Sequence, residues 1–228
     1  MPSYARRHQL GRTLIYHIFN RSNARLEIFH SEQDYRHCIK LIREYSDSFS
    51  AKVYHWVLMP NHYHLLLEID IPEELSAMMA GLNRAYTHYY HATYHSAGFL
   101  WQGRFKSQPV EKESYLIACG RYIERNPVRA GIVSEAAEYS YSSARFYCKG
   151  EPDGITIEDP TFCEFGKDDI KRRSWYIEFL RDFNSEEEKF FGNFEHPLGS
   201  QEFIHRLLKI NGRYVPRRKG GIPKTLVA

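Results

Sequence analysis

The chain contains 228 residues, of which 43% are hydrophobic and 26% charged, so it has enough apolar residues for a substantial core and is not a disordered chain. No apolar run approaches the ~18–20 residues of a membrane span. The first twenty residues lack the apolar stretch of a secretory signal. The four cysteines are widely spaced, which argues against a zinc ribbon, and the lack of such a signal argues against a disulfide scaffold. We therefore expect a cytoplasmic protein.

The net charge of +3 is distributed unevenly along the chain. Residues 1–150 carry 18 basic and 14 acidic side chains, residues 151–204 carry 6 and 14, and residues 205–228 carry 7 and none. This pattern predicts a main domain, an acidic and partly helical extension, and a basic tail. The tail contains Arg217, Arg218 and Lys219 beside Gly and Pro, a composition that favours either polyanion binding or a merely solubilising role.

Apolar periodicity predicts alternating strands and helices in the main domain. β-branched and aromatic runs predict strands over residues 12–19, 53–59, 62–69 and 105–110. Helical spacing predicts helices after a capping box at Ser31 and Asp34, over residues 75–90, and over residues 113–126. Further helices are expected over residues 175–183 and 201–209.

The predicted order is β-α-β-β-α-β followed by a helix. This order matches an α+β fold of the ferredoxin-like plait type, in which one antiparallel sheet leaves a face open. We expect the helix after the last strand to pack on that open face, and a mostly helical C-terminal extension to follow.

Two histidines, His62 and His64, alternate with Tyr63 in a predicted strand. The period of two places both imidazoles on one face, where they are able to converge on one cation or one phosphate. The same pattern also fits structural histidines that are hydrogen-bonded to the backbone. His55, on the partner strand, is a candidate structural histidine of this kind.

The predicted helix that ends at Asn126 and Pro127 carries a second set of polar side chains. Tyr115, Cys119, Tyr122 and Asn126 share one helix face, and Pro127 places Asn126 at the end of the helix. An amide oxygen is a plausible third ligand for a hard divalent cation. Two histidines and one amide would leave coordination positions open for a scissile phosphate, which a tyrosine hydroxyl could attack.

Three motifs resemble the REP-associated tyrosine transposases of the HUH single-strand transposase superfamily of bacterial insertion sequences. They are MPNHYHLLL at residues 59–67, LWQGRF at residues 100–105 and YIERNPVRAG at residues 122–131, and the resemblance covers residues 10–147. It implies that residues 1–150 form the catalytic domain. It also implies Mg²⁺ or Mn²⁺ as cofactor and a single-stranded DNA hairpin as partner.

By position, the resemblance implies that His62 and His64 are metal ligands, that Tyr122 is the nucleophile and that Asn126 completes the metal site. Tyr115 is a weaker rival for the role of nucleophile. Candidate DNA contacts are the following: Trp101, Arg104, Phe105, Lys106, Arg121, Arg125 and Arg129 near the site, with Arg217, Arg218 and Lys219 in the tail. Trp101 and Phe105 also fit a packing role.

The implied function is a metal-dependent endonuclease and strand transferase that cleaves and rejoins DNA near palindromic, REP-like hairpins through a covalent 5′-phosphotyrosine. Two alternatives are a domesticated hairpin-binding protein without transposition activity and a metal-dependent phosphodiesterase that uses water. The resemblance leaves open the hairpin sequence, the choice of metal, and whether the protein acts as a monomer or a homodimer. A bacterial cytoplasmic location, on the nucleoid when bound to DNA, is expected.

Overall fold

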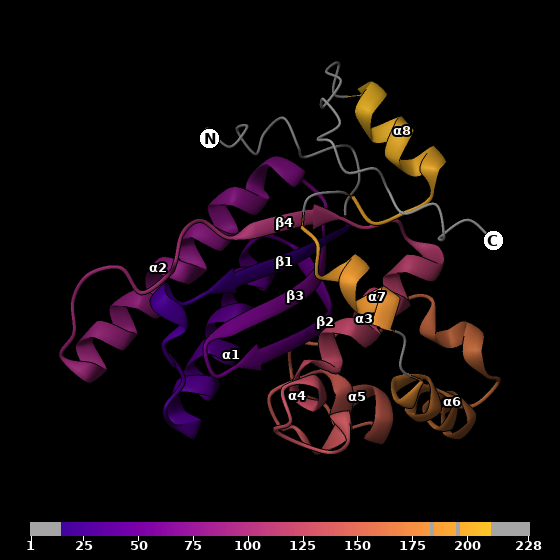
Figure 1. Ribbon diagram of the computed structural model, residues 1–228, viewed down its shortest axis with the longest axis horizontal. Helices are drawn as coiled ribbons and strands as arrows, with labels where there is room; N and C mark the ends of the chain where they lie inside the picture. Colours follow the sequence, from indigo (N-terminus) through magenta and orange to yellow (C-terminus); the bar gives the residue numbers. More distant parts are fainter. Residues whose placement is uncertain (1–14, 183–184, 195–196, 211–228) are drawn as a thin grey trace.

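A four-stranded antiparallel sheet forms the centre of the protein in the computed structural model, which describes residues 15–182, 185–194 and 197–210 (Figure 1). Its spatial order is β2-β3-β1-β4. The strands are β1 (Ile15–Arg21), β2 (Ala51–Met59), β3 (His62–Ile69) and β4 (Lys106–Pro109). This is the order of a ferredoxin-like plait, so the predicted α+β fold is confirmed.

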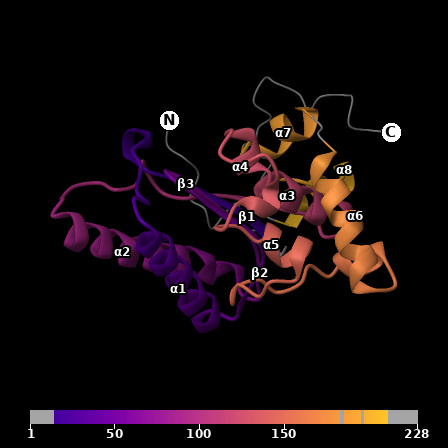
Figure 2. The ribbon, with the colours of Figure 1, turned by 90° about the horizontal axis from the view of Figure 1, so that it is seen from below.

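Two helices, α1 (Glu32–Ser48) and α2 (Leu75–Tyr94), cover one face of the sheet (Figure 2). The predicted capping box is present at the start of α1, where Asp34 accepts hydrogen bonds from the backbone and hydroxyl of Ser31. The strands turn Tyr16, Ile18, Leu65 and Leu67 towards these helices, and all four side chains are buried. This is the main hydrophobic core.

The other face of the sheet is covered by α3 (Glu113–Glu124), as predicted for the helix after the last strand. Leu116, Cys119 and Ile123 of α3 pack with Leu66 of β3 in a second core. Gly120 permits the close approach, because a Cβ at this position would lie 2.6 Å from the His55 ring.

The helix predicted over residues 113–126 is shorter in the structure, and this is a correction. α3 ends at Glu124, and Asn126 begins a separate short helix, α4 (Asn126–Arg129). Pro127 explains the break because it has no N–H to donate to the carbonyl of Ile123. Strand β1 likewise runs to Arg21, beyond the predicted end at residue 19.

The C-terminal extension packs against α3 rather than standing apart. Tyr176 and Leu180 of the extension share a third core with Ile117 and Tyr147. The short helix α5 (Ala144–Lys149) precedes the extension. The helices that follow are α6 (Asp169–Arg181), α7 (Ser185–Phe191) and α8 (Gln201–Ile210). Of the helices in the described ranges, none is both long enough and apolar enough to cross a membrane.

Candidate active site

Strand alternation places His62 and His64 on the face of the sheet that α3 covers. Their ring centroids lie 5.3 Å apart. Tyr63 points to the opposite face, where its hydroxyl donates to Asn83 Oδ1 at 2.9 Å. The alternation of the strand therefore places the two histidines on one face and Tyr63 on the other, as the sequence predicted.

A third histidine, His17 of β1, belongs to the same cluster and was missed by sequence reasoning. His64 lies opposite Phe19 in the β1–β3 register, so His17, two residues earlier, shares its face. The Nε2 atom of His17 lies 2.9 Å from Nδ1 of His64. Alternation within residues 15–19 indicates which side chains of β1 share a face with His17. The register between β1 and β3 was also needed to predict that His17 lies beside His64.

The end of α3 fixes the orientation of the Asn126 amide. Its Nδ2 donates to the backbone carbonyls of Tyr122 and Ile123, at 3.0 Å each. The side chain thus replaces the backbone donor that Pro127 lacks. Its Oδ1 is turned away from α3, accepts a hydrogen bond from Arg129 and lies within hydrogen-bonding reach of His62.

Tyr122 lies beside the histidines and is only 8% exposed. Its ring centroid is 5.7 Å from that of His64 and 5.8 Å from that of His17. The guanidinium of Arg129 lies 5.1 Å from the same ring. The structure therefore gathers His62, His64, Tyr122 and Asn126 at one place. Tyr115 packs against Phe190 instead.

Burial keeps the three histidines of the cluster neutral. It lowers the pKa of His17 to about 3 and that of His62 to about 4, and it lowers the pKa of His64 well below its ordinary value. A neutral imidazole keeps a lone pair for a metal. Burial raises the pKa of Tyr122, while the nearby charge of Arg129 opposes this rise.

These donors fit a divalent cation. The Nδ1 atom of His62 lies 2.7 Å from Asn61 Oδ1, and the amide nitrogen of Asn61 donates to the carbonyl of Arg25 at 2.9 Å. Asn61 therefore accepts the Nδ1 proton, which leaves Nε2 of His62 for a ligand. Within the described part of the chain, no cluster of three or more His, Cys, Asp or Glu residues forms a metal site. The predicted set of ligands, His62, His64 and Asn126, differs from such clusters because one of its three members is an asparagine amide.

Residues 191–194 of the extension cover the cluster. Phe191 packs 5.9 Å from the Tyr122 ring, and Phe194 packs 4.6 Å from His17. The amide nitrogen of Gln108 donates to the backbone carbonyl of Asn193 at 2.9 Å. Sequence reasoning assigned no role to this segment, because its place over the sheet depends on long-range packing.

The candidate DNA contacts are divided between the surface and the interior. Arg104, Lys106 and Arg129 are exposed, whereas Phe105 is buried in the main core. Trp101 packs against α2, where its Nε1 donates to Asn83 and Thr87. Arg121 and Arg125 are turned towards the extension, where they pair with Glu187 and with the carbonyl of Leu180. The three tail residues, Arg217, Arg218 and Lys219, lie outside the described residues.

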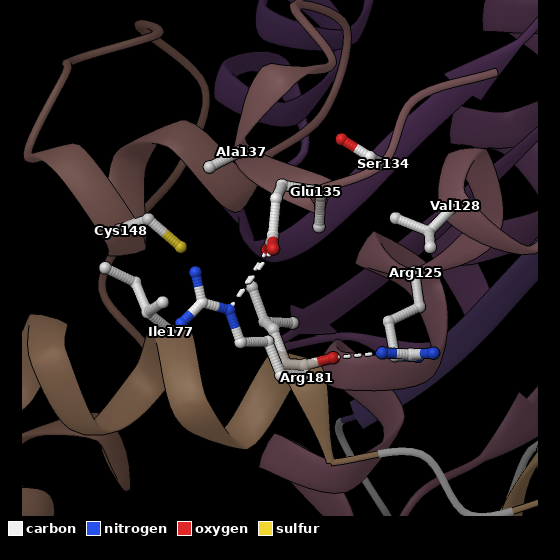
Figure 3. Close-up of a pocket in the computed structure, with 10 residues that line it drawn as sticks. Arg125, Val128, Ser134, Glu135, Ala137, Cys148, Ile177 and Arg181 are labelled. Atoms are coloured by element: carbon white, nitrogen blue, oxygen red, sulfur yellow. Dashed lines mark hydrogen bonds and ion pairs between the residues drawn. The ribbon is translucent and has the colours of Figure 1, made fainter.

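A pocket of about 210 Å³ lies elsewhere, between α4, α5 and α6 (Figure 3). The ion pair between Arg181 and Glu135, at 3.3 Å, crosses it. Since neither the histidines nor Tyr122 nor Asn126 line this pocket, it is separate from the candidate active site.

This chain is similar to known transposases in its fold and in part of its sequence. A REP-associated tyrosine transposase, solved bound to a REP hairpin, has a similar fold, with a TM-score of 0.53 and 20% identity over 69% of this chain and 93% of the other. A candidate transposase from Deinococcus radiodurans has 18% identity over 58% of this chain and 90% of its own, with a TM-score of 0.37. Among curated proteins, none matches this chain. Residues 12–126, half of the sequence, match the family of IS200-like transposases. This span contains the histidine pair, Tyr122 and Asn126, and the chain belongs to that family.

Proposed function

We propose that the protein is a metal-dependent endonuclease and strand transferase that acts on single-stranded DNA near palindromic hairpins. The observation that carries this proposal is the juxtaposition of Tyr122 with His64, together with the Asn126 amide bound to the same helix end. The proposed nucleophile, Tyr122, and the proposed nitrogen and oxygen ligands thus lie around one small region. Phosphoryl transfer requires such proximity of nucleophile and metal.

Tyr122 is the proposed nucleophile. Its phenolic oxygen forms a bond to the scissile phosphorus, the bond to the 3′-oxygen breaks, and the leaving oxygen takes up a proton to become a free 3′-hydroxyl. The product is a 5′-phosphotyrosine that keeps the energy of the phosphodiester, so a second 3′-hydroxyl is able to reverse the step and rejoin a strand. Arg129, next to the ring, stabilises the phenolate.

His62, His64 and Asn126 are the residues that would hold Mg²⁺ or Mn²⁺. When bound there, such a cation polarises the scissile phosphate. Two imidazoles and an amide suit Mn²⁺, whereas hard oxygen ligands and greater abundance favour Mg²⁺.

Basic side chains beside the site support a DNA substrate. Arg129 and Lys106 are exposed, and Lys106 lies 6.0 Å from the ring of Phe19 on the histidine face. Arg21 is close enough to His62 to lower the pKa of that histidine further. Cations in these positions would hold backbone phosphates without reading sequence. The hairpin is proposed because the fold relative was solved with one.

The direct test is a covalent-adduct assay with end-labelled single-stranded palindromes and either metal. We expect wild-type protein to form a metal-dependent protein–DNA adduct, and Tyr122→Phe to form none because it lacks the attacking oxygen. Tyr115→Phe is the matched control and should behave as wild type. Hairpin binding without any adduct would favour a domesticated binding protein, and cleavage without an adduct would favour a hydrolase.

A further inference from the structure

We propose that Arg21 binds the DNA phosphate next to the scissile one and that Gln102 is a positioning residue, which orients the guanidinium of Arg21. The proposal deepens the proposed function above and rests on it. It gives the LWQGRF motif at residues 100–105 a role in substrate binding, although Trp101 and Phe105 of this motif pack against the main core.

The first step is the position of Arg21 on the sheet. Arg21 is the last residue of β1 and lies opposite His62 in the β1–β3 register, so the two side chains share the histidine face. On the other side of β1, the backbone N–H of Gln102 donates to the carbonyl of Arg21 at 2.9 Å. Arg21 therefore stands between a proposed metal ligand and the loop that precedes β4.

The second step is the contact between the two side chains. The amide oxygen of Gln102 accepts hydrogen bonds from Nε of Arg21 at 3.1 Å and from Nη2 at 2.9 Å. These two donors form one edge of the guanidinium, so the edge made by Nη1 and Nη2 remains for a further acceptor. A phosphate is able to accept two parallel hydrogen bonds from such an edge.

The third step is the charge. An amide has no net charge, so Gln102 orients the guanidinium without neutralising it. In residues 15–182, 185–194 and 197–210, no ion pair joins Arg21 to an aspartate or glutamate. Other arginines of the protein do pair with carboxylates: Arg36, Arg121, Arg145, Arg172, Arg173 and Arg181. Arg21 thus combines a fixed orientation with a full positive charge, which suits an anionic ligand.

The loop that carries Gln102 is itself anchored. The Nε1 atom of Trp101, the preceding residue, donates to the carbonyl of Asn83 and to the hydroxyl of Thr87, both at 3.1 Å. The backbone of Trp101 also forms a bridge to Ser22, at the end of β1. The amide is therefore held by α2 and by the sheet before DNA arrives, which lowers the cost of ordering the site on binding.

The position of the guanidinium indicates which phosphate it meets. His62 and His64 lie on β3, whereas Gln102 draws the guanidinium of Arg21 towards the β4 side of β1. Neighbouring strands lie about 4.8 Å apart. The guanidinium therefore lies beside the histidine pair, and its ligand is the neighbour of the scissile phosphate.

The first measurement is binding without cleavage, in the Tyr122→Phe background. The probes are the single-stranded palindromes of the adduct assay, in which one phosphate at a time is replaced by a neutral methylphosphonate. We expect replacement of the phosphate next to the scissile one to weaken binding about 10- to 100-fold when Arg21 is present, because charged hydrogen bonds are lost. The same replacement should have no effect in Arg21→Ala. A loss of equal size in both proteins would overturn the role of Arg21.

The phosphate site and the proposed function fail separately. An adduct from wild-type protein, with no phosphate whose contribution depends on Arg21, would refute the site and leave the endonuclease. A phosphate that depends on Arg21, in DNA that forms no adduct, would retain Arg21 as a phosphate ligand and refute the endonuclease. Absence of binding to every palindrome would overturn both.

Variants of Gln102 test orientation apart from charge. Gln102→Leu leaves the charge of Arg21 in place but removes the acceptor, and it should reduce the effect of the methylphosphonate several-fold. Arg21→Lys keeps a charge without the planar fork and should not restore the effect. Arg84→Ala, which removes an exposed arginine from α2, is the control and should retain the effect in full. An undiminished effect in Gln102→Leu would show that Gln102 does not position Arg21.

Discussion

At the scale of single residues, His55 has a buried carboxylate partner at each of its two ring nitrogens. Its Nδ1 lies 2.8 Å from Glu124 and its Nε2 lies 3.1 Å from Asp159, all fully buried. Burial opposes a charge on the ring, but the bonds to Asp159 and Glu124 outweigh it and raise the pKa of His55 to about 9. The ring is therefore an imidazolium that donates from both nitrogens, and His55 has the structural role that sequence reasoning allowed for it.

The charge on His55 makes the free energy of unfolding depend on pH. The folded pKa of His55 lies above the unfolded value of 6.5, so its contribution is complete below pH 6.5 and is lost as the pH rises through about 9. His17, His62 and His64 have lowered pKa values, so their contribution is lost as the pH falls below 6.5. We expect the free energy of unfolding, measured by urea denaturation, to be greatest near pH 6.5.

The matching variant is His55→Gln, which leaves Glu124 and Asp159 buried without their cation. Loss of one partner from a buried ionic group costs about 3–5 kcal/mol. The variant should also lose the decline in stability between pH 7 and about pH 9. Exposed His88→Gln serves as the control and should retain the decline. An unchanged pH profile in His55→Gln would show that the ring is neutral.

At the scale of elements, the contact between α3 and the sheet depends on a glycine. Gly120→Ala would place a methyl group 2.6 Å from the His55 ring, which is itself held on both sides and has no room to retreat. Overpacking of this kind costs about 1–3 kcal/mol. We expect a lower melting temperature for Gly120→Ala and no change for Gly103→Ala, where nothing lies within 4 Å of the added carbon. Equal melting temperatures would mean that α3 shifts freely on the sheet.

Much of the fold was predictable because its signals are local. Alternation and turn residues place β2 and β3 correctly, and the Ser31 capping box marks the start of α1. The same alternation separates His62 and His64 from Tyr63. The register that brings His17 to His64 could not be predicted, since it joins residues 47 positions apart. The break before Asn126 was missed because the helix was expected to continue to Asn126, two residues beyond its end at Glu124.

At the scale of the whole molecule, the candidate site is assembled within one chain. The helix that carries Tyr122 is tied to β2 through Glu124 and His55, and to α7 through Arg121 and Glu187. Exchange of α3 between two protomers would have to remake both pairs between the chains. We therefore expect that mixing His64→Ala with Tyr122→Phe does not restore the covalent adduct. Recovery of adduct in the mixture would show that protomers exchange the helix and that the site is shared.

The buried His55 network also limits how this enzyme could be shortened or recombined with other domains. Asp159 and Tyr176, both beyond residue 150, complete the set of partners around His55 and Glu124. A truncation at residue 150 would remove Asp159 from His55 and Tyr176 from Glu124, which lies two positions along α3 from the proposed nucleophile Tyr122. The extension is thus part of the same folding unit, and a shortened variant would need a group that replaces the Asp159 carboxylate beside His55.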